Sequence, residues 1–355
     1  MRIAVCHPVA SRGTGGAEAH VESLVRALRD AGHDTTIVGA PYSRATAEEL
    51  VDQMAAWRSL DVEAAAGGPV DLVIALKFPA YLVRHDRKVV WLMQQLHDAY
   101  ELWEHHEYGR LARQEGGETA RRIVWNADRR ALGEATRLYA TSRNVRGRLA
   151  RSLGLEATVL YHRSALCARL LGRDPGAHGD YVLVPGRLES RKRQLLAVEA
   201  MDHVRSGVRL VVVGDGPDAG RLRDRARRGR AGGRIEFLSG VGDDELAELY
   251  RSATAVCYPP FDEDYGYVTL EAFAAARPVV TTIDAGGPLE FVRDGETGAV
   301  TTAGPGPLAA AFDLLATDRT SGDDMGRAGR AELLANVPDW PEVVARLLGE
   351  TPLVR

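Results

Sequence analysis

Two glutamates lie on either side of a predicted helix start in the sequence YPPFDEDYGYVTLEAFA. Glu263 precedes this helix, and Glu271 lies about one turn inside it. Because Gly266 marks the turn, the backbone N–H groups of Tyr267 and Val268 should point out of the helix start, where anions bind. Carboxylates instead accept hydrogen bonds from sugar and ribose hydroxyls. The pattern predicts a diphosphate with one acid on each side of it; the alternative is a solvated loop acid and a helix-surface acid.

Two cations follow another predicted strand, in the sequence VPGRLESRKR. The strand ends at Gly186, Arg187 comes next, and Lys192 follows five residues later. Ligands collect at the carboxyl ends of the strands in open α/β sheets. We therefore expect Arg187 and Lys192 to converge on the diphosphate and to neutralise the charge that develops on a leaving group. A basic turn that is solvated at the surface is the alternative.

Glycines at two further strand ends would let the backbone approach a bulky anion closely. Gly15 and Gly16 separate the first predicted strand from a helix, and Gly214 ends the strand in VVVGDGPD. A residue without a side chain allows this approach, but tight turns need glycine as well. These positions are therefore weaker candidates than the acids and the cations.

Short β-branched runs alternate with amphipathic stretches throughout the chain, which is typical of buried parallel strands joined by helices. The predicted strands lie at 2–8, 35–40, 71–76, 88–93, 137–142, 180–188, 208–216, 234–240, 254–260 and 278–283. The segment from about 100 to 135 is predicted to be helical. A polar linker, LGRDPGAHG, separates two halves of similar size. We predict two Rossmann-like domains, 1–170 and 178–337, and a final helix at about 338–350 that can pack back on the first domain.

Composition excludes several classes of protein. The net charge of −4 gives no general signal for nucleic acid, so we expect no nucleic-acid partner. Three scattered cysteines argue against disulfides and a zinc site. The chain opens on a strand and contains no long apolar stretch, so we expect a cytoplasmic protein. The arginine-rich segment 221–230 is expected to be a solvated helix face, with peripheral contact to an anionic membrane as the alternative.

These motifs together resemble the retaining glycosyltransferases of GT-B fold, specifically the family-4 (group 1) type. Glu263 and Glu271 match the E-x7-E pair of that family, and Arg187 and Lys192 match its diphosphate clamp. Gly15 and Gly16 match the N-terminal Gly-Gly loop of the family, and AGGPLEFVRDGETG matches its late Gly-rich segment. The resemblance covers nearly the whole chain. It implies two Rossmann-like domains that face each other across a cleft.

The resemblance also implies roles for individual residues. Glu271 would hold the ribose of the donor, Glu263 would contact the transferred sugar, and Arg187 and Lys192 would hold the diphosphate. The Gly15-Gly16 loop would face the phosphates or the acceptor. Transfer would retain the anomeric configuration by front-face attack, without a protein nucleophile, a metal or any other cofactor.

The sequence departs from the family in several places. Tyr265 stands where Phe is common, and Arg193 stands where Gly is frequent. Gln94 occupies a position where several relatives carry His, which makes His97 the candidate imidazole and adds it to the catalytic candidates. Asp262-Glu263-Asp264 is formally a metal-binding D-x-D, but the two cations already supply positive charge, so we expect no metal.

The expected reaction moves a hexose or N-acetylhexosamine to a saccharide, lipid-linked or natural-product hydroxyl. A UDP-sugar is favoured as donor over GDP-mannose. The alternatives are a GT-B-fold nucleotide-sugar epimerase and a non-catalytic nucleotide-sugar-binding subunit. A nicotinamide dehydrogenase is disfavoured because no G-x-G-x-x-G follows the first strand.

Overall fold

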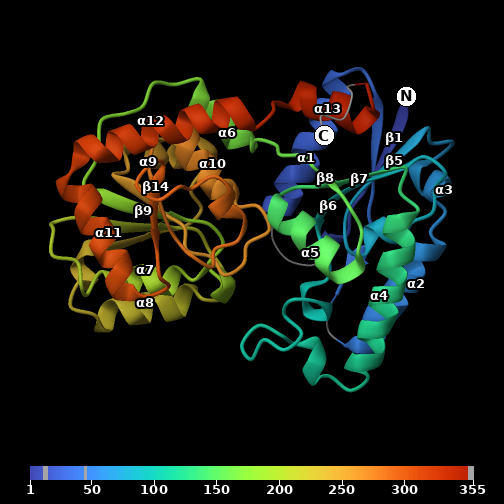
Figure 1. The fold of residues 1–355 in the computed structure, drawn as a ribbon, viewed down its shortest axis with the longest axis horizontal. Helices are drawn as coiled ribbons and strands as arrows, with labels where there is room; N and C mark the ends of the chain where they lie inside the picture. The colour runs from blue at the N-terminus through green and yellow to red at the C-terminus, as the bar shows by residue number, and fades with distance from the viewer. Residues whose placement is uncertain (11–14, 44–45, 351–355) are drawn as a thin grey trace. The chain divides into compact units, whose positions relative to one another are not determined.

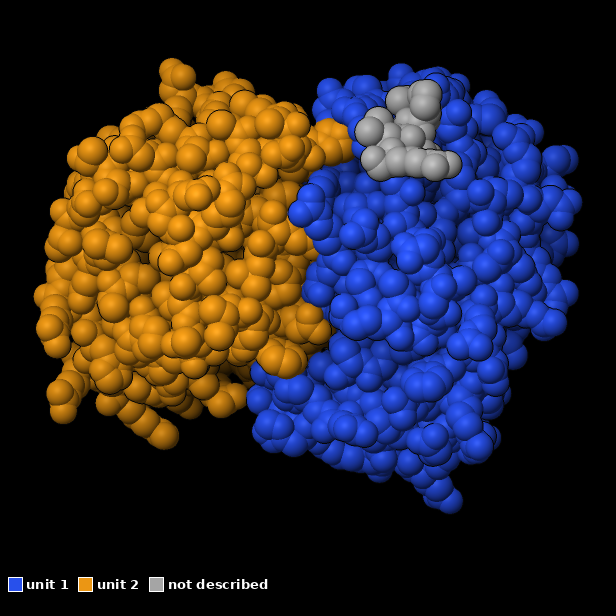
Figure 2. All heavy atoms as spheres, viewed as in Figure 1, with its two compact units in different colours: residues 1–162, 339–355 blue, residues 163–338 orange. Residues whose placement is uncertain are grey.

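The computed structural model describes residues 1–10, 15–43 and 46–350 and divides the chain into two compact units. Unit 1 comprises Met1–His162 together with the segment from Asp339 onward, and unit 2 comprises Arg163–Pro338 (Figure 2). Each unit contains one six-stranded parallel sheet with helices on its faces (Figure 1). The predicted α/β class is therefore confirmed.

The sheet of unit 1 has the strand order β3-β1-β5-β6-β7-β8. Its strands are β1 (Arg2–Cys6), β3 (Asp34–Val38), β5 (Leu72–Lys77), β6 (Lys88–Gln94), β7 (Arg137–Ala140) and β8 (Thr158–Val159). A separate short pair is formed by β2 (Val9–Ala10) and β4 (Pro41–Tyr42). The central strands are buried on both faces, which explains why they are continuous apolar runs rather than alternating ones.

Helices cover both faces of this sheet. One face packs against α1 (Gly16–Asp30) and α13 (Trp340–Leu348). The other packs against α2 (Ala47–Ser59), α4 (Gly117–Gly133) and α5 (Arg143–Leu153), with the short α3 (Val62–Ala66) nearby. Short 3₁₀ turns, η1 (Ala80–Leu82), η2 (His97–Ala99) and η3 (Leu111–Arg113), connect these elements.

The sheet of unit 2 has the order β11-β10-β9-β12-β13-β14. Its strands are β9 (Tyr181–Pro185), β10 (Arg209–Val213), β11 (Ile235–Leu238), β12 (Ala255–Cys257), β13 (Val279–Thr282) and β14 (Gly298–Thr301). One helical layer consists of α7 (Gln194–Ala200), α8 (Ala219–Arg228) and α11 (Pro305–Thr317). The other layer consists of α6 (Ala165–Leu171), α9 (Asp243–Ser252), α10 (Tyr267–Ala274) and α12 (Arg319–Asn336) (Figure 1). The turns η4 (Ser190–Lys192), η5 (Gly232–Arg234) and η6 (Gly287–Glu290) complete the unit.

Two details differ from the sequence prediction. The first unit ends at 162 rather than at 170, because α6 contacts α9 and α10 and so belongs to unit 2. The segment from 100 to 135 is helical only from Gly117, apart from η3. Gly116 has φ +72°, and a Cβ on Gly109 would lie 2.1 Å from the Leu102 carbonyl oxygen, so these two glycines favour turns over a continuous helix.

A buried cluster of histidine and tryptophan rings joins α13 to the rest of unit 1. His20 of α1 and His162 are almost fully buried, and His20 Nδ1 lies 2.6 Å from His162 Nε2. The Trp91 ring of β6 and the Trp340 ring of α13 pack against both imidazoles. Burial lowers the pKa of His20 to about 3 and the pKa of His162 well below its ordinary value. The folded protein therefore keeps both rings neutral.

This arrangement predicts a loss of stability in mild acid. Below pH 6.5 the unfolded chain binds protons that the folded state excludes, so the free energy of unfolding falls as pH falls. His20 alone should lower the free energy of unfolding by about 2 kcal/mol as the pH falls from 6.5 to 5. Denaturant titrations across this range test the effect. His162→Gln retains a hydrogen-bonding partner for His20 and should reduce the loss of stability in acid. If the pH dependence of stability did not change, the two buried histidines would not be its cause.

Candidate functional site

Two glycine turns meet at the carboxyl edge of the unit 2 sheet. Gly186 follows β9 with φ +123°, and Gly214 follows β10 with φ +138°. A Cβ on Gly214 would lie 2.1 Å from the carbonyl oxygen of Gly186. Backbone therefore packs directly on backbone, and both turns need glycine for steric reasons. Gly186 and Gly214 are both predicted from the sequence to contact the nucleotide, and they lie at the edge of the sheet where ligands collect in open α/β folds.

Lys192 and Glu263 form an ion pair at the same edge. The Lys192 ammonium, at the end of η4, contacts the Glu263 carboxylate and donates to the Tyr258 hydroxyl at 3.2 Å. Both side chains are mostly buried, with exposed fractions of 22% and 18%. Burial opposes each charge, but the partner outweighs it, so the pKa of Lys192 is raised and the pKa of Glu263 is lowered. Both groups are therefore charged at neutral pH.

The contacts of Arg193 explain how an arginine can occupy a position where glycine is frequent in the family that the sequence resembles. Its backbone has φ +51°, a left-handed conformation that favours glycine. Its guanidinium compensates by pairing with the Asp284 carboxylate at 2.6 and 2.9 Å and by donating to the carbonyl oxygens of Pro259 and Pro260. The loop that leads to Glu263 is thereby tied to the segment that carries Lys192.

Arg187 lies in the loop between β9 and η4 and is more exposed than Lys192. Its guanidinium is 3.3 Å from the Glu189 carboxylate, and about half of the side chain is accessible to solvent. The Gln194 side chain donates to the Arg187 carbonyl oxygen at 2.8 Å and so fixes the backbone at this turn. The structure thus joins Lys192 to Glu263 directly, whereas Arg187 is exposed in the loop before η4 and pairs with Glu189.

The start of α10 is set by Gly266, which occupies the N-cap position with φ +90°. A Cβ there would lie 3.0 Å from Pro288 and 3.1 Å from the Tyr258 ring, so a larger residue would force the loop outward. Tyr267 and Val268 form the first turn of this helix, as the sequence predicted. The positive end of the helix therefore faces the carboxyl edge of the sheet.

Glu271 lies inside α10 in an environment unlike that of Glu263. Its two oxygens accept hydrogen bonds from the Ser164 hydroxyl at 2.8 Å and the Tyr250 hydroxyl at 2.7 Å. Burial raises the pKa of Glu271, and these two donors oppose the rise. Ser164 and Tyr250 were not predicted from the sequence, because neither lies near a recognisable motif.

The candidates in unit 1 lie at the carboxyl edge of its own sheet. Gly15 is the N-cap of α1, Gly16 is the first residue of the helix, and the Gly15 N–H donates to the Glu18 carboxylate at 2.9 Å. The preceding residues of this motif, 11–14, lie outside the described residues. Glu18 also approaches His7 at 3.8 Å, and this imidazole lowers the pKa of Glu18 to about 2.

His97 is buried in the turn η2 that follows β6. Its Nδ1 contacts the Glu101 carboxylate, which also lies 3.7 Å from the Arg148 guanidinium of α5. Burial alone would raise the pKa of Glu101. His97 and Arg148 lower it by more than burial raises it, so the net shift is downward. The carboxylate thereby fixes the orientation of the imidazole. Glu101 and Arg148 are further residues that the sequence analysis did not identify.

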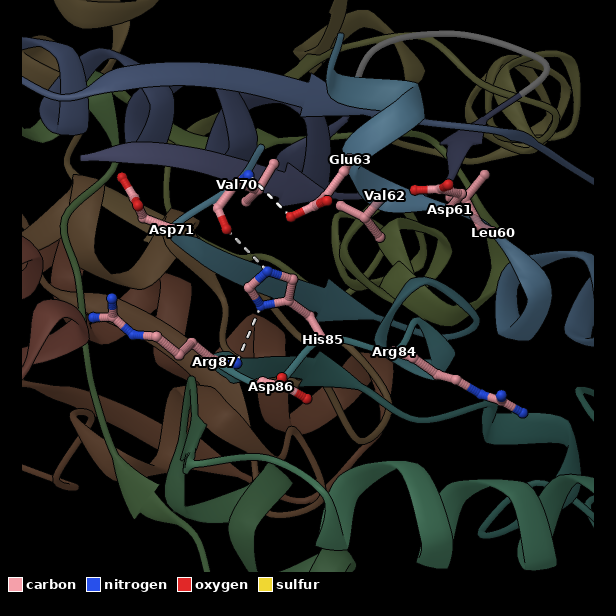
Figure 3. Close-up of a pocket in the computed structure, with 10 residues that line it drawn as sticks. All are labelled: Leu60, Asp61, Val62, Glu63, Val70, Asp71, Arg84, His85, Asp86 and Arg87. Atoms are coloured by element: carbon pink, nitrogen blue, oxygen red, sulfur yellow. Dashed lines mark hydrogen bonds between the residues drawn. The ribbon is translucent and has the colours of Figure 1, made fainter. Parts of the chain in front are cut away.

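A pocket of about 570 Å³ lies at the opposite edge of the unit 1 sheet, before the starts of β5 and β6. Figure 3 shows the His85 ring at its wall, hydrogen-bonded at 3.1 Å to the Val70 carbonyl oxygen and to the Arg87 N–H. None of the residues predicted for the site lines this pocket. It is lined by Leu60, Asp61, Val62, Glu63, Val70, Asp71, Arg84, His85, Asp86 and Arg87.

The arginine-rich segment forms α8 and the turn after it. Arg225 pairs with Asp202 and Glu199, and Arg227 pairs with Asp224, so part of the charge is neutralised locally. Within the described part of the chain, no helix is long and apolar enough to cross a bilayer. Contact with an anionic membrane stays the untested alternative to a solvated helix face.

The same described ranges contain no group of three or more His, Cys, Asp or Glu side chains arranged to hold a metal ion. The central residue of the D-x-D sequence, Glu263, is instead paired with Lys192.

Comparisons with known proteins identify the family. Residues 15–161 match the glycosyl transferase 4-like domain, and residues 176–332 match glycosyl transferases group 1. The chain therefore belongs to the group 1 glycosyltransferases. It is 28% identical over 343 residues to the D-inositol 3-phosphate glycosyltransferase of Acidothermus cellulolyticus, a match that covers 80% of this chain and 74% of that protein.

Solved structures show that the fold is GT-B. Sucrose-phosphate synthase from Thermosynechococcus elongatus superposes with a TM-score of 0.76 at 19% identity, covering 98% of this chain and 97% of that one. Anabaena Alr3699/HepE, solved in complex with UDP-glucose, superposes with a TM-score of 0.69 at 16% identity over 99% of both chains. The family and the fold predicted from the sequence are confirmed.

Because the two glycine turns are in direct contact, a methyl group added at Gly214 should strongly destabilise the folded protein. Gly214→Ala places a Cβ against the Gly186 carbonyl and strains φ, so unfolding should become easier by several kcal/mol. Gly220→Ala in α8 is the matched control, because a Cβ there meets open space and should leave stability unchanged or slightly raised. Urea titrations of both variants measure the difference; equal midpoints would contradict the packing argument.

Proposed function

We propose that this glycosyltransferase moves a hexose or N-acetylhexosamine from a nucleoside diphosphate sugar to an acceptor hydroxyl, with retention of configuration and without a metal. A UDP-sugar is the favoured donor and GDP-mannose the alternative. The acceptor is a saccharide, a lipid-linked sugar or a natural product. The observation that carries the donor assignment is the charged Lys192–Glu263 pair beside the start of α10.

The diphosphate fits this edge of unit 2 for electrostatic reasons. The first turn of α10 offers backbone N–H groups, and Lys192 supplies a localised positive charge. Arg187 is exposed, and its pairing with Glu189 is a surface ion pair, so moving it to a phosphate costs little. Positive charge placed there stabilises the leaving nucleoside diphosphate as the glycosidic bond breaks.

The two glutamates are suited to different hydroxyls. Glu263 contacts the cation that would hold the phosphate, so it lies where the transferred sugar would be joined to that phosphate. Glu271 has no such contact with Lys192 and is surrounded by hydroxyl donors, which suits a ribose. Glu263 is therefore proposed to bind the transferred sugar, and Glu271 is proposed to bind the ribose.

The transfer step needs no nucleophile from the protein. The bond between the sugar C1 and the phosphate oxygen breaks, and its electron pair stays on the leaving phosphate. The acceptor oxygen attacks C1 from the same face, and its proton passes to the departing phosphate oxygen. The products are a nucleoside diphosphate and a glycoside of unchanged configuration.

In unit 1, His97 is proposed to contact a substrate hydroxyl. The Glu101 carboxylate holds Nδ1 and so directs the other ring nitrogen. The Gly15 turn is proposed to bind phosphate or acceptor through its backbone. Among the known proteins, Anabaena HepE was solved with UDP-glucose, which supports the preference for a UDP-sugar. No observation favours the epimerase or the non-catalytic alternative.

A panel of nucleotide sugars tests the donor assignment. UDP-glucose, UDP-N-acetylglucosamine and GDP-mannose are added separately, and the rise in melting temperature identifies the ligand that binds the folded state. The anomeric configuration of the product, read by NMR, then tests retention. Failure of every nucleotide sugar to stabilise the protein would overturn the proposal.

Removing Lys192 should damage both binding and turnover. Lys192→Ala is expected to weaken nucleoside diphosphate binding about 10- to 100-fold, because a charge-assisted contact is lost, and to lower kcat/KM at least as much. Calorimetry and initial rates measure these effects. Arg209→Ala removes an exposed cation of the same unit and is the matched control. Because Lys192→Ala leaves Glu263 without its partner, Lys192→Met/Glu263→Gln provides a neutral version; unchanged nucleotide affinity in both would remove Lys192 from the clamp.

Chelation tests the absence of a metal requirement. Activity should survive excess EDTA, because Lys192 and the start of α10 supply the positive charge that a divalent ion would otherwise provide. Rates are compared before and after chelation, and again after Mg²⁺ is added. Complete loss of activity that Mg²⁺ restores would instead assign a metal-binding role to the D-x-D sequence.

A further inference from the structure

The carboxylate of Glu271 is held by two hydroxyl groups that come from separate elements. Ser164 lies at the N-cap of α6, and Tyr250 lies in α9 with its ring fully buried. The Ser164 hydroxyl donates to Oε1 at 2.8 Å, and the Tyr250 hydroxyl donates to Oε2 at 2.7 Å. Each oxygen of the carboxylate therefore has one protein donor, and the plane of the group is fixed.

This environment differs from that of Glu263, which is stabilised by a cation. Burial and the nearby charge of Asp243 both disfavour the ionised form of Glu271, and the hydrogen bonds from Tyr250 and Ser164 favour it. The Cys167 thiol beside Ser164 is also buried, and its pKa is raised to about 12, so it adds no negative charge at neutral pH. Hydroxyl donors thus take the place of a counter-ion.

A carboxylate in this state can accept a vicinal diol. Its two oxygens offer about four lone-pair positions in total, and the two protein donors occupy one on each oxygen. The positions that remain, one on each oxygen, suit a pair of neighbouring hydroxyl groups. The 2′- and 3′-hydroxyls of a ribose are such a pair.

We propose that Tyr250 and Ser164 are positioning residues that orient Glu271 to bind both ribose hydroxyls, so that the site prefers a ribonucleotide to a deoxyribonucleotide. This inference rests on the proposed function, because it assumes that a nucleoside diphosphate binds beside α10. Neither residue touches the reacting atoms. Their effect is exerted through the orientation and the ionisation of one carboxylate.

Ser164 contributes in a second way, through its place in the chain. Its hydroxyl oxygen also accepts the Cys167 N–H at 3.3 Å, which caps α6. The preceding residue, Arg163, donates to the Val337 carbonyl oxygen at 2.6 and 2.9 Å. The first residues of unit 2 are therefore anchored at two points, and the Ser164 hydroxyl is held in register with α10.

The test uses the full chain with UDP and 2′-deoxy-UDP as probes, and with the two guanosine counterparts in parallel. The wild type should bind the ribonucleotide about 10-fold more tightly than the deoxynucleotide, since one hydrogen bond to a charged group is lost. Tyr250→Phe should weaken binding of the ribonucleotide about 3- to 10-fold and weaken the deoxynucleotide by a smaller factor, because the deoxynucleotide keeps only its 3′-hydroxyl to bind Glu271. Tyr181→Phe is the matched control, because its hydroxyl donates to a backbone carbonyl of the same unit, that of Leu249, at 2.8 Å.

Dependence on pH separates positioning from a general structural role. Loss of the Tyr250 hydroxyl should raise the pKa of Glu271 further, so the affinity deficit of Tyr250→Phe should grow as pH falls from 8 to 6. In a Glu271→Gln background, Tyr250→Phe should have no further effect on ribonucleotide affinity. Ser164→Ala removes both the donor and the helix cap, whereas Ser164→Thr keeps a hydroxyl and should restore binding.

Two outcomes would overturn this inference and leave the proposed function intact. One is a Tyr250→Phe protein that binds UDP and GDP as tightly as the wild type. The other is an equal loss for ribo- and deoxynucleotides that does not vary with pH. If the wild type binds none of these nucleotides, the proposed function fails and the inference fails with it.

Discussion

The ion pair between Lys192 and Glu263 is the interaction on which the candidate site depends. Both groups are largely withdrawn from water, where each charge alone would be costly, and each is stable because the other is present. Arg193 holds the two segments that carry them together, because its guanidinium donates to the carbonyl oxygens of Pro259 and Pro260. A charged centre is thus maintained at the carboxyl edge of a parallel sheet, beside the start of a helix. Under the proposed function, an anionic ligand that binds there finds a cation whose position is already fixed by Glu263 and Tyr258.

The two glutamates show how environment separates residues of the same type. Glu263 has a cationic partner that lowers its pKa, whereas Glu271 is supported by neutral donors and has a raised pKa. They are eight residues apart in the sequence, yet one belongs to a loop and the other to a helix. This contrast supports different roles more strongly than the spacing of the pair does.

Much of the fold could be predicted from the sequence, because the central strands are continuous apolar runs with glycine at their ends. The edge strands β8 and β14 were missed, since they are short, with two and four residues. Lys192, Glu263 and Glu271 were found from motifs, but Tyr250 and Ser164 were not. They reach Glu271 from positions 21 and 107 residues away, and only the packing of α6, α9 and α10 brings them together. Arg193 was noticed as an unusual residue, whereas its contacts with Asp284 and two prolines required the structure.

The place of α13 in unit 1 affects how the chain can fold during synthesis. Val343, Val344 and Leu347 complete an apolar layer whose other members lie before residue 161. A ribosome therefore synthesises the whole of unit 2 before the last piece of the first core is made. Until then the apolar face of α1 lacks its cover, a state in which nascent chains are prone to aggregate. Unit 2, which is continuous in sequence, has no such delay and can reach its native packing first.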